Sequence, residues 1–184
     1  LEGDDVLIGG SGNDTIKGGE GDDAIYGDSG DDTISTGEGN DSVWGGSGDD
    51  TITSTAGTDT IDAGSGDNSI DVSSTDSTIS AGSGDDTVNV LAGSGSSFDL
   101  GEGNNVLIAD ASVGSVTTGS GDDVIKLSGG QDAVWINTYK ETATDGSWEW
   151  GWFELDVRYW GDFSNKSWVK AGSGDDIITL AGTI

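Results

Sequence analysis

The chain has 184 residues, and its 35 acidic and 6 basic side chains give a formal net charge of −29 at pH 7. It contains no Cys and no His, which excludes disulfides, thiolate or imidazole zinc sites and catalytic triads of the serine-protease type. No apolar run approaches the ~18 residues of a membrane span, and so acidic a surface excludes nucleic acid as a partner.

A nine-residue repeat runs through most of the chain, and from Gly9 it begins GGSGNDTIK, GGEGDDAIY, GDSGDDTIS, TGEGNDSVW, GGSGDDTIT. We number each unit 1 to 9, with a bulky aliphatic residue at position 8. These residues are Ile16, Ile25, Ile34, Val43, Ile52, Ile61, Ile70, Ile79 and Val88. Such a fixed period indicates a stacked solenoid and argues against a disordered acidic chain, which lacks ordered β-branched residues.

Each unit divides into a turn and a strand. Positions 1–6 are glycine, small or acidic, as a tight turn requires. Positions 7–9 are typically Thr-Ile-x, which predicts a three-residue strand with only the middle side chain pointing inward. One unit makes a half-turn and two make a full coil. We therefore predict an all-β fold, a right-handed parallel β-roll of two facing sheets with coils ~4.8 Å apart.

The register of the repeat defines the expected domain organisation. It holds from Gly9 to Asn89, gains one extra residue near Val90 and resumes over 91–135. The roll is therefore expected over 1–135, an irregular segment over 136–170, and a last repeat with the C-terminal end over 171–184. Because 1–8 already read as most of a unit, we expect a segment of a longer protein without a signal peptide.

Consecutive turns lie on opposite edges of a two-sheet roll, so each turn stacks on the turn two units away. One edge keeps Gly-x-Gly and an oxygen-bearing side chain at position 6 throughout; these side chains are Asp14, Asp32, Asp50, Asn68, Asp86, Asn105, Asp123 and Asp176. The other edge has Asp5, Asp23, Asp41 and Asp59, and then three turns with no acid at position 6. The sequence thus predicts an intact edge and a decaying edge.

This pattern favours calcium, which takes six to eight hard oxygen ligands in a flexible geometry, over magnesium, which demands a rigid octahedron. Glycines let successive carbonyls converge, and the position-6 side chains listed above complete sites between stacked turns. The gaps between turns predict about ten calcium ions, with weaker sites beside Asn68 and Asn105 because an amide is a neutral ligand. Ions in this number would leave a net charge ordinary for a folded domain.

At this point the chain resembles the RTX, or haemolysin-type, calcium-binding repeat family, whose pattern is GGxGxDxUx. The resemblance implies a parallel β-roll with calcium held by the position-6 aspartates and loop carbonyls. It also implies a bacterial protein that leaves the cell through type I secretion, stays unfolded in the low-calcium cytosol and folds outside. We therefore expect a secreted or cell-surface location.

The irregular segment 136–170 is rich in aromatic residues, including Trp148, Trp150, Trp152, Tyr159 and Trp160. Its alternation of bulky and other residues predicts a small β-structure. We consider an end cap, which repeat proteins need, a glycan-binding surface, or a contact with a neighbouring domain. On the roll itself, position 9 of one sheet carries Ile8, Tyr26, Trp44 and later Trp135 in an outward column, which indicates either a contact face or ordinary surface residues.

No catalytic motif such as HExxH, GxSxG or a phosphate loop is present, and the repeated carboxylates are equivalent rather than singular. We therefore expect no enzyme activity. The predicted function is a calcium-binding structural module of a large secreted or surface protein of adhesin or surface-layer type. A glycan-binding module and a trailing module of a secreted enzyme are the alternatives.

Overall fold

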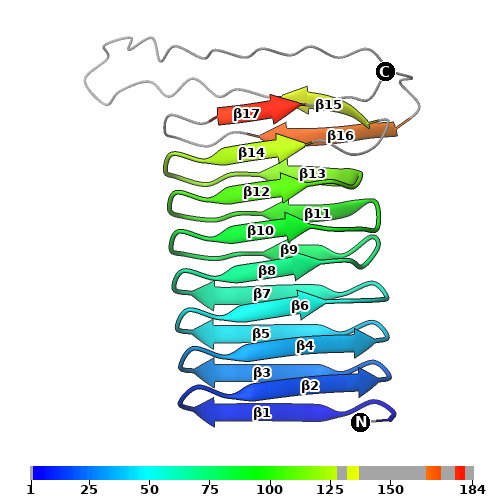
Figure 1. Ribbon diagram of the computed structural model, residues 1–184, viewed down its shortest axis with the longest axis vertical. Helices are drawn as coiled ribbons and strands as arrows, with labels where there is room; N and C mark the ends of the chain where they lie inside the picture. Colours follow the sequence, from blue (N-terminus) through cyan, green and yellow to red (C-terminus); the bar gives the residue numbers. More distant parts are fainter. Residues whose placement is uncertain (1, 128–131, 137–164, 171–176, 181–184) are drawn as a thin grey trace.

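The computed structural model describes residues 2–127, 132–136, 165–170 and 177–180. Within these ranges the chain forms only parallel strands, arranged in two sheets that face each other along an elongated solenoid (Figure 1). None of the described residues belongs to a helix that could cross a membrane. The predicted all-β parallel roll is confirmed.

Successive strands alternate between the two sheets along most of the chain. The nine-stranded sheet contains, in spatial order, β1 (Val6–Ser11), β3 (Ala24–Ser29), β5 (Ser42–Ser47), β7 (Thr60–Ser65), β9 (Thr78–Ser80), β11 (Ser96–Asp99), β13 (Val113–Thr117), β16 (Asn165–Lys170) and β15 (Asp132–Ile136). The eight-stranded sheet contains β2 (Thr15–Glu20), β4 (Thr33–Glu38), β6 (Thr51–Ser54), β8 (Ser69–Val72), β10 (Thr87–Val90), β12 (Val106–Ala109), β14 (Val124–Leu127) and β17 (Ile177–Leu180). The nine-residue repeat is therefore two interleaved ladders from β1 to β15, whereas β15 and β16 lie in the same sheet.

Strand pairing follows the repeat in register. Thr15 of β2 pairs with Thr33 of β4, and Val6 of β1 pairs with Ala24 of β3. Each pair is offset by two units, which stacks every turn on the turn two units away. This confirms that the two edges of the roll must be considered separately.

The core holds two inward columns in each sheet, not one. Position-8 residues such as Ile25 and Ile52 are fully buried, and so are position-1 residues such as Ala63 and Val72. Several strands are six residues long and run from position 7 to position 3 of the next unit. The prediction of three-residue strands with one inward side chain is therefore wrong. A strand that continues through position 9 returns position 1 to the inner face, because side chains alternate.

The extra residue enters immediately after Val90. Val90 is buried and pairs with Val72 and Ala109, so it occupies a regular position 1. Leu91, the next residue, is 58% exposed. The insertion is absorbed by the turn that precedes β11, on the decaying edge, where Figure 1 shows turns of uneven size.

At the C-terminal end, β17 pairs with β14 and β16 pairs with β13, so both strands continue the two ladders. β16 belongs to the segment 136–170 that the sequence sets apart. The aromatic residues proposed as a cap or glycan surface, Trp148, Trp150, Trp152, Tyr159 and Trp160, lie outside the described residues.

Tyr26 and Trp44 form an aromatic stack in the described part of the outward column at position 9. The rings of Tyr26 and Trp44 lie parallel, with centroids 4.7 Å apart. This distance matches the spacing between neighbouring strands, so the two ring faces cover each other and the ring edges face solvent. The predicted contact face at this column stays a prediction.

Candidate metal sites at the turn edges

Glycine allows the turns to stack closely. Gly48, at position 4, has a φ of +128°, a left-handed conformation that L side chains rarely adopt. A methyl group placed on it would lie 2.3 Å from the carbonyl oxygen of Gly30 in the turn below. This close stacking brings the position-6 side chains of successive turns into one column on each edge.

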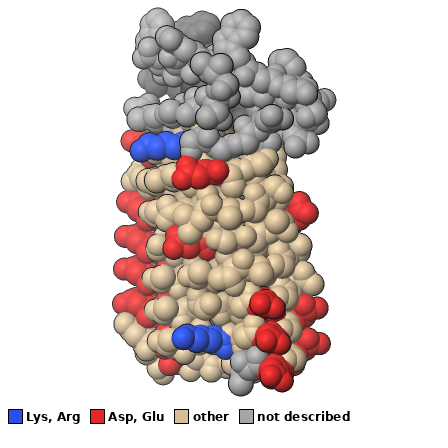
Figure 2. Space-filling model, turned by 45° about the vertical axis from the view of Figure 1, so that its right-hand side comes forward, with Lys and Arg blue, Asp and Glu red and all other residues tan. Residues whose placement is uncertain are grey.

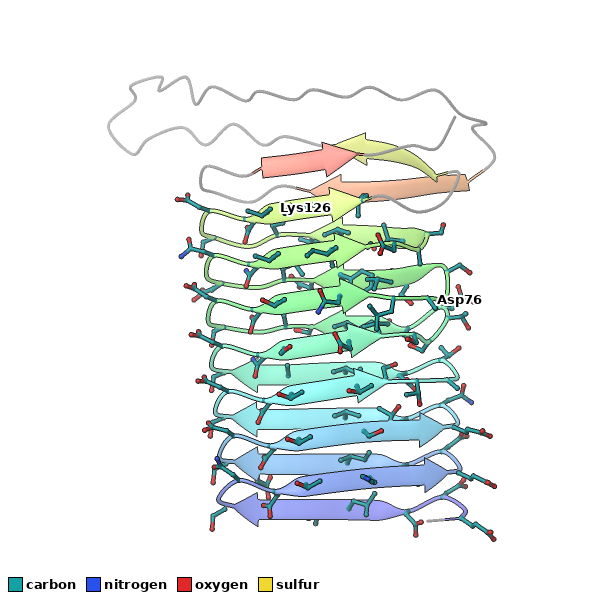
Figure 3. All side chains as sticks on the ribbon, viewed as in Figure 1. Asp76 and Lys126 are labelled. Carbon is teal, nitrogen blue, oxygen red and sulfur yellow. The ribbon has the colours of Figure 1, made fainter. Side chains whose placement is uncertain are left out.

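A ladder of hydrogen bonds fixes one oxygen of each position-6 carboxylate. On the intact edge, the backbone N–H of Asp14 donates to Oδ1 of Asp32 at 2.8 Å, and that of Asp32 donates to Oδ1 of Asp50 at 2.8 Å. On the decaying edge, the N–H of Asp23 donates to Oδ1 of Asp41 at 2.8 Å. Figure 3 shows that side chains line both edges of the roll at regular intervals. Because the ladder bond occupies Oδ1, Oδ2 is the carboxylate oxygen that can bind a cation.

The second oxygen, Oδ2, is buried and accepts no hydrogen bond in Asp14, Asp23, Asp32, Asp41, Asp50 and Asp86. A buried carboxylate oxygen without a donor costs several kcal/mol unless a cation compensates it. One such atom would be an anomaly, but here it recurs in register along both edges. The arrangement therefore fits bound cations.

Backbone carbonyls supply further oxygens beside these atoms. A methyl group on Gly9 would lie 2.8 Å from Oδ2 of Asp14 and 2.9 Å from the carbonyl oxygen of Gly27. A methyl group on Gly45 would lie 2.7 Å from Oδ2 of Asp50 and 2.4 Å from the carbonyl oxygen of Ala63. A glycine at position 1 thus leaves a space that a carboxylate oxygen and a carbonyl oxygen of the next turn both face.

The ligand chemistry fits calcium. No group of three or more Asp, Glu, His or Cys side chains converges in the described part of the chain. Carbonyl oxygens must therefore contribute to each coordination shell together with a carboxylate. Hard, mostly neutral oxygens in a flexible backbone cradle suit Ca²⁺, which accepts backbone carbonyls readily.

Burial disfavours the charged form of three of these carboxyl groups, Asp41, Asp50 and Asp86, and so raises the pKa of each. Burial raises the pKa of Asp86 to about 6. It also raises the pKa of Asp41 and Asp50, against the effect of the backbone hydrogen bonds that each accepts. Neutralisation of these groups, by protons or by a cation, therefore favours the folded state.

Metal-free protein is expected to gain β-structure when it is acidified. The pKa of Asp86 is about 6 in the fold and has an ordinary value of 3.8. Between these values the folded state binds more protons than the unfolded state, so the free energy of unfolding falls as pH rises through this window. Circular dichroism of metal-free protein at pH 5 and pH 7.5 measures this. A stronger β signal at pH 7.5 would contradict it.

The decaying edge changes character at Asp59. The hydroxyl of Ser54 donates to Oδ2 of Asp59, so this carboxylate is satisfied by the protein itself. The ladder then continues on hydroxyls, because the N–H of Asp59 donates to Oγ of Ser77 at 2.8 Å and that of Ser77 donates to Oγ of Ser96 at 3.1 Å. Buried Val72, Val90 and Ala109 occupy position 1 at the adjacent coils. Beyond Asp59, hydroxyls and apolar packing therefore hold this edge.

A second ladder of hydrogen bonds, at position 5, is not predicted from the sequence. The N–H of Asp22 donates to Oδ1 of Asp4 at 2.9 Å, and the N–H of Asp49 donates to Oδ1 of Asp31 at 3.0 Å. These side chains are exposed and the bonds run in the opposite direction to those of position 6. Figure 2 shows acidic side chains gathered in columns near the edges of the roll. Position 5 is Asp or Asn in most intact turns, and this pattern in the sequence could have predicted the ladder.

The predicted ligands fall into three groups. The buried ones are Asp23, Asp32, Asp41, Asp50, Asp59, Asn68, Asp86, Asn105 and Asp123. Asp5 and Asp14 are half-buried, at the N-terminal end of the two columns. Asp176 lies outside the described residues.

Comparison with known families agrees with this reading of the site. A family model described as the RTX calcium-binding nonapeptide repeat, in four copies, matches residues 1–34, 26–61, 35–70, 62–96 and 115–135. The matched ranges span more than half of the 184 residues. No curated protein matches the chain.

Proposed function

The chain belongs to the family of RTX calcium-binding nonapeptide repeats, and we propose that it is a calcium-dependent structural module of a bacterial secreted or cell-surface protein. The observation that supports this most is the recurrence of buried Oδ2 atoms without a donor, in register on both edges. An adhesin or surface-layer protein is the favoured parent. A trailing module of a secreted enzyme is the alternative, in which this chain itself performs no catalysis.

The residues of each site have distinct roles in this function. The ladder bond on Oδ1 orients the carboxylate, and Oδ2 lies near the same space beside the position-1 glycine as a carbonyl oxygen of the stacked turn. Calcium, when bound, neutralises the buried carboxylate and links two consecutive turns of one edge. The glycines of the turn leave the backbone close enough for its carbonyls to take part.

The proposed location follows from the same physics. Without cations, a net charge of −29 and the buried carboxylates oppose folding. With calcium at the millimolar concentrations found outside cells, the same groups become ligands. Folding would thus be withheld in the low-calcium cytosol and completed outside, which suits a protein exported unfolded through type I secretion.

Asp32→Ala is expected to remove calcium, whereas Asp31→Ala is not. Asp32 is buried and its Oδ2 has no donor. The neighbouring Asp31 is exposed and accepts hydrogen bonds at the surface from the N–H of Asp49 and the side-chain amide of Asn13. Calcium bound per chain, measured by atomic emission after equilibrium dialysis, should fall by at least one ion in Asp32→Ala. It should stay at the parent value in Asp31→Ala. Equal counts in the two variants would refute the proposed ligands.

A further inference from the structure

Two position-6 residues of the intact edge are asparagines, Asn68 and Asn105, in turns that keep Gly-x-Gly but carry Ala63 and Leu100 instead of glycine at position 1. Both are buried: Asn68 is 2% exposed and Asn105 is fully buried. From the sequence alone, both are expected to be weak calcium ligands through their amide oxygens. Their hydrogen bonds indicate a different role.

The amide oxygen of each asparagine is already engaged. Oδ1 of Asn68 accepts the backbone N–H of Asp50 at 3.0 Å, and Oδ1 of Asn105 accepts the N–H of Asp86 at 2.9 Å. These are the same ladder bonds that Oδ1 makes in the aspartates. A flipped amide would place an NH₂ donor against an N–H donor. The ladder therefore fixes the NH₂ group where an aspartate has its second oxygen.

The NH₂ group contacts the carbonyls that line the site. Nδ2 of Asn68 donates to the carbonyl oxygen of Gly66 at 3.0 Å and lies 3.4 Å from that of Ala81. Nδ2 of Asn105 donates to the carbonyl oxygen of Gly103 at 3.2 Å. Ala81 occupies the position in the repeat that Gly27 occupies beside Asp14. At Asn68, this carbonyl faces a hydrogen-bond donor instead of a carboxylate oxygen.

We infer that Asn68 and Asn105 close two calcium positions, with the amide NH₂ group taking the place of the ion. The inference rests on the proposed function, in which the aspartate positions bind calcium. An N–H donor cannot ligate a cation, and it already satisfies the carbonyls that would. The intact edge then binds calcium in separate groups, first at Asp14, Asp32 and Asp50 and next at Asp86. The number of bound ions is then smaller than the number predicted from the sequence, which is about ten.

Asn68→Asp tests this directly. The substitution replaces the NH₂ group by an oxygen of nearly the same size, so it should open one site and raise the calcium bound per chain by one. The free energy of unfolding should also rise more steeply with calcium concentration than in the parent chain, because one more ion binds only the folded state. Asn105→Asp should behave in the same way at the second position.

Asp50→Asn provides the converse test. It should lower the count by one and keep the β-structure seen by circular dichroism, because the new NH₂ group can donate to local carbonyls. Asn68→Asp or Asn105→Asp that folds without an additional ion would overturn the inference, and so would Asp50→Asn that keeps its full count. If the parent chain itself binds no calcium, the proposed function fails instead.

Discussion

Removal of calcium by excess chelator is expected to abolish most of the β-structure of this chain. The folded state contains buried carboxylate oxygens without donors on both edges, and the chain carries a net charge of −29. Each uncompensated buried charge costs several kcal/mol, whereas domains are stable by only about 5–15 kcal/mol. A few bare sites therefore exceed the stability that the core supplies.

The core offers little to offset this cost. In the N-terminal units position 1 is often glycine, as at Gly9, Gly18, Gly27 and Gly45, so only the position-8 column buries large side chains there. Far-ultraviolet circular dichroism at pH 7.5, before and after addition of EDTA, measures the loss. Added calcium should restore the spectrum and the same concentration of magnesium should not. A chelated sample with its full β signal would show that calcium is not required for the fold.

Much of this architecture could be predicted from the sequence because the repeat is short and regular. The aliphatic residues at position 8 predict the core. Sorting the turns into two alternating sets predicts the two edges. The sequence places the loss of acids after Asp59, and in the structure hydroxyl groups already take part in the edge at Asp59 itself. These features depend only on residue type and on the period of the repeat, so the sequence is sufficient to predict them.

Other features depend on contacts between turns and could not be predicted. The inward direction of position 1 follows from strands that run beyond the Thr-Ile-x segment. The exact place of the extra residue became clear only from the pairing of Val90 with Val72. The orientation of the Asn68 amide is fixed by the N–H of Asp50, a residue in another turn. In sequence, Asn68 differs from an aspartate by one atom and suggests only a weaker ligand.

Alanine substitutions at two position-4 glycines, Gly48 and Gly12, are expected to distinguish the cost of backbone strain from the cost of forcing stacked turns apart. Gly48 has a φ of +128° and Gly12 has a φ of +102°, so alanine is strained at both positions. A methyl group on Gly48 would lie 2.3 Å from the carbonyl oxygen of Gly30, whereas one on Gly12 meets nothing within 4 Å. Only the first substitution therefore pushes two turns of the intact edge apart.

Gly12→Ala should lower the free energy of unfolding in calcium by ~1–2 kcal/mol, the cost of a left-handed alanine. Gly48→Ala should lower it by more than ~4 kcal/mol, the range of severe substitutions, and should reduce the calcium bound per chain. The second effect follows because Gly48 lies in the turn that carries Asp50, whose Oδ2 faces the carbonyl of the next turn. Urea unfolding at fixed calcium, with calcium counts on the same samples, measures both effects. Equal losses of stability in the two variants would mean that close stacking of the turns does not limit the fold.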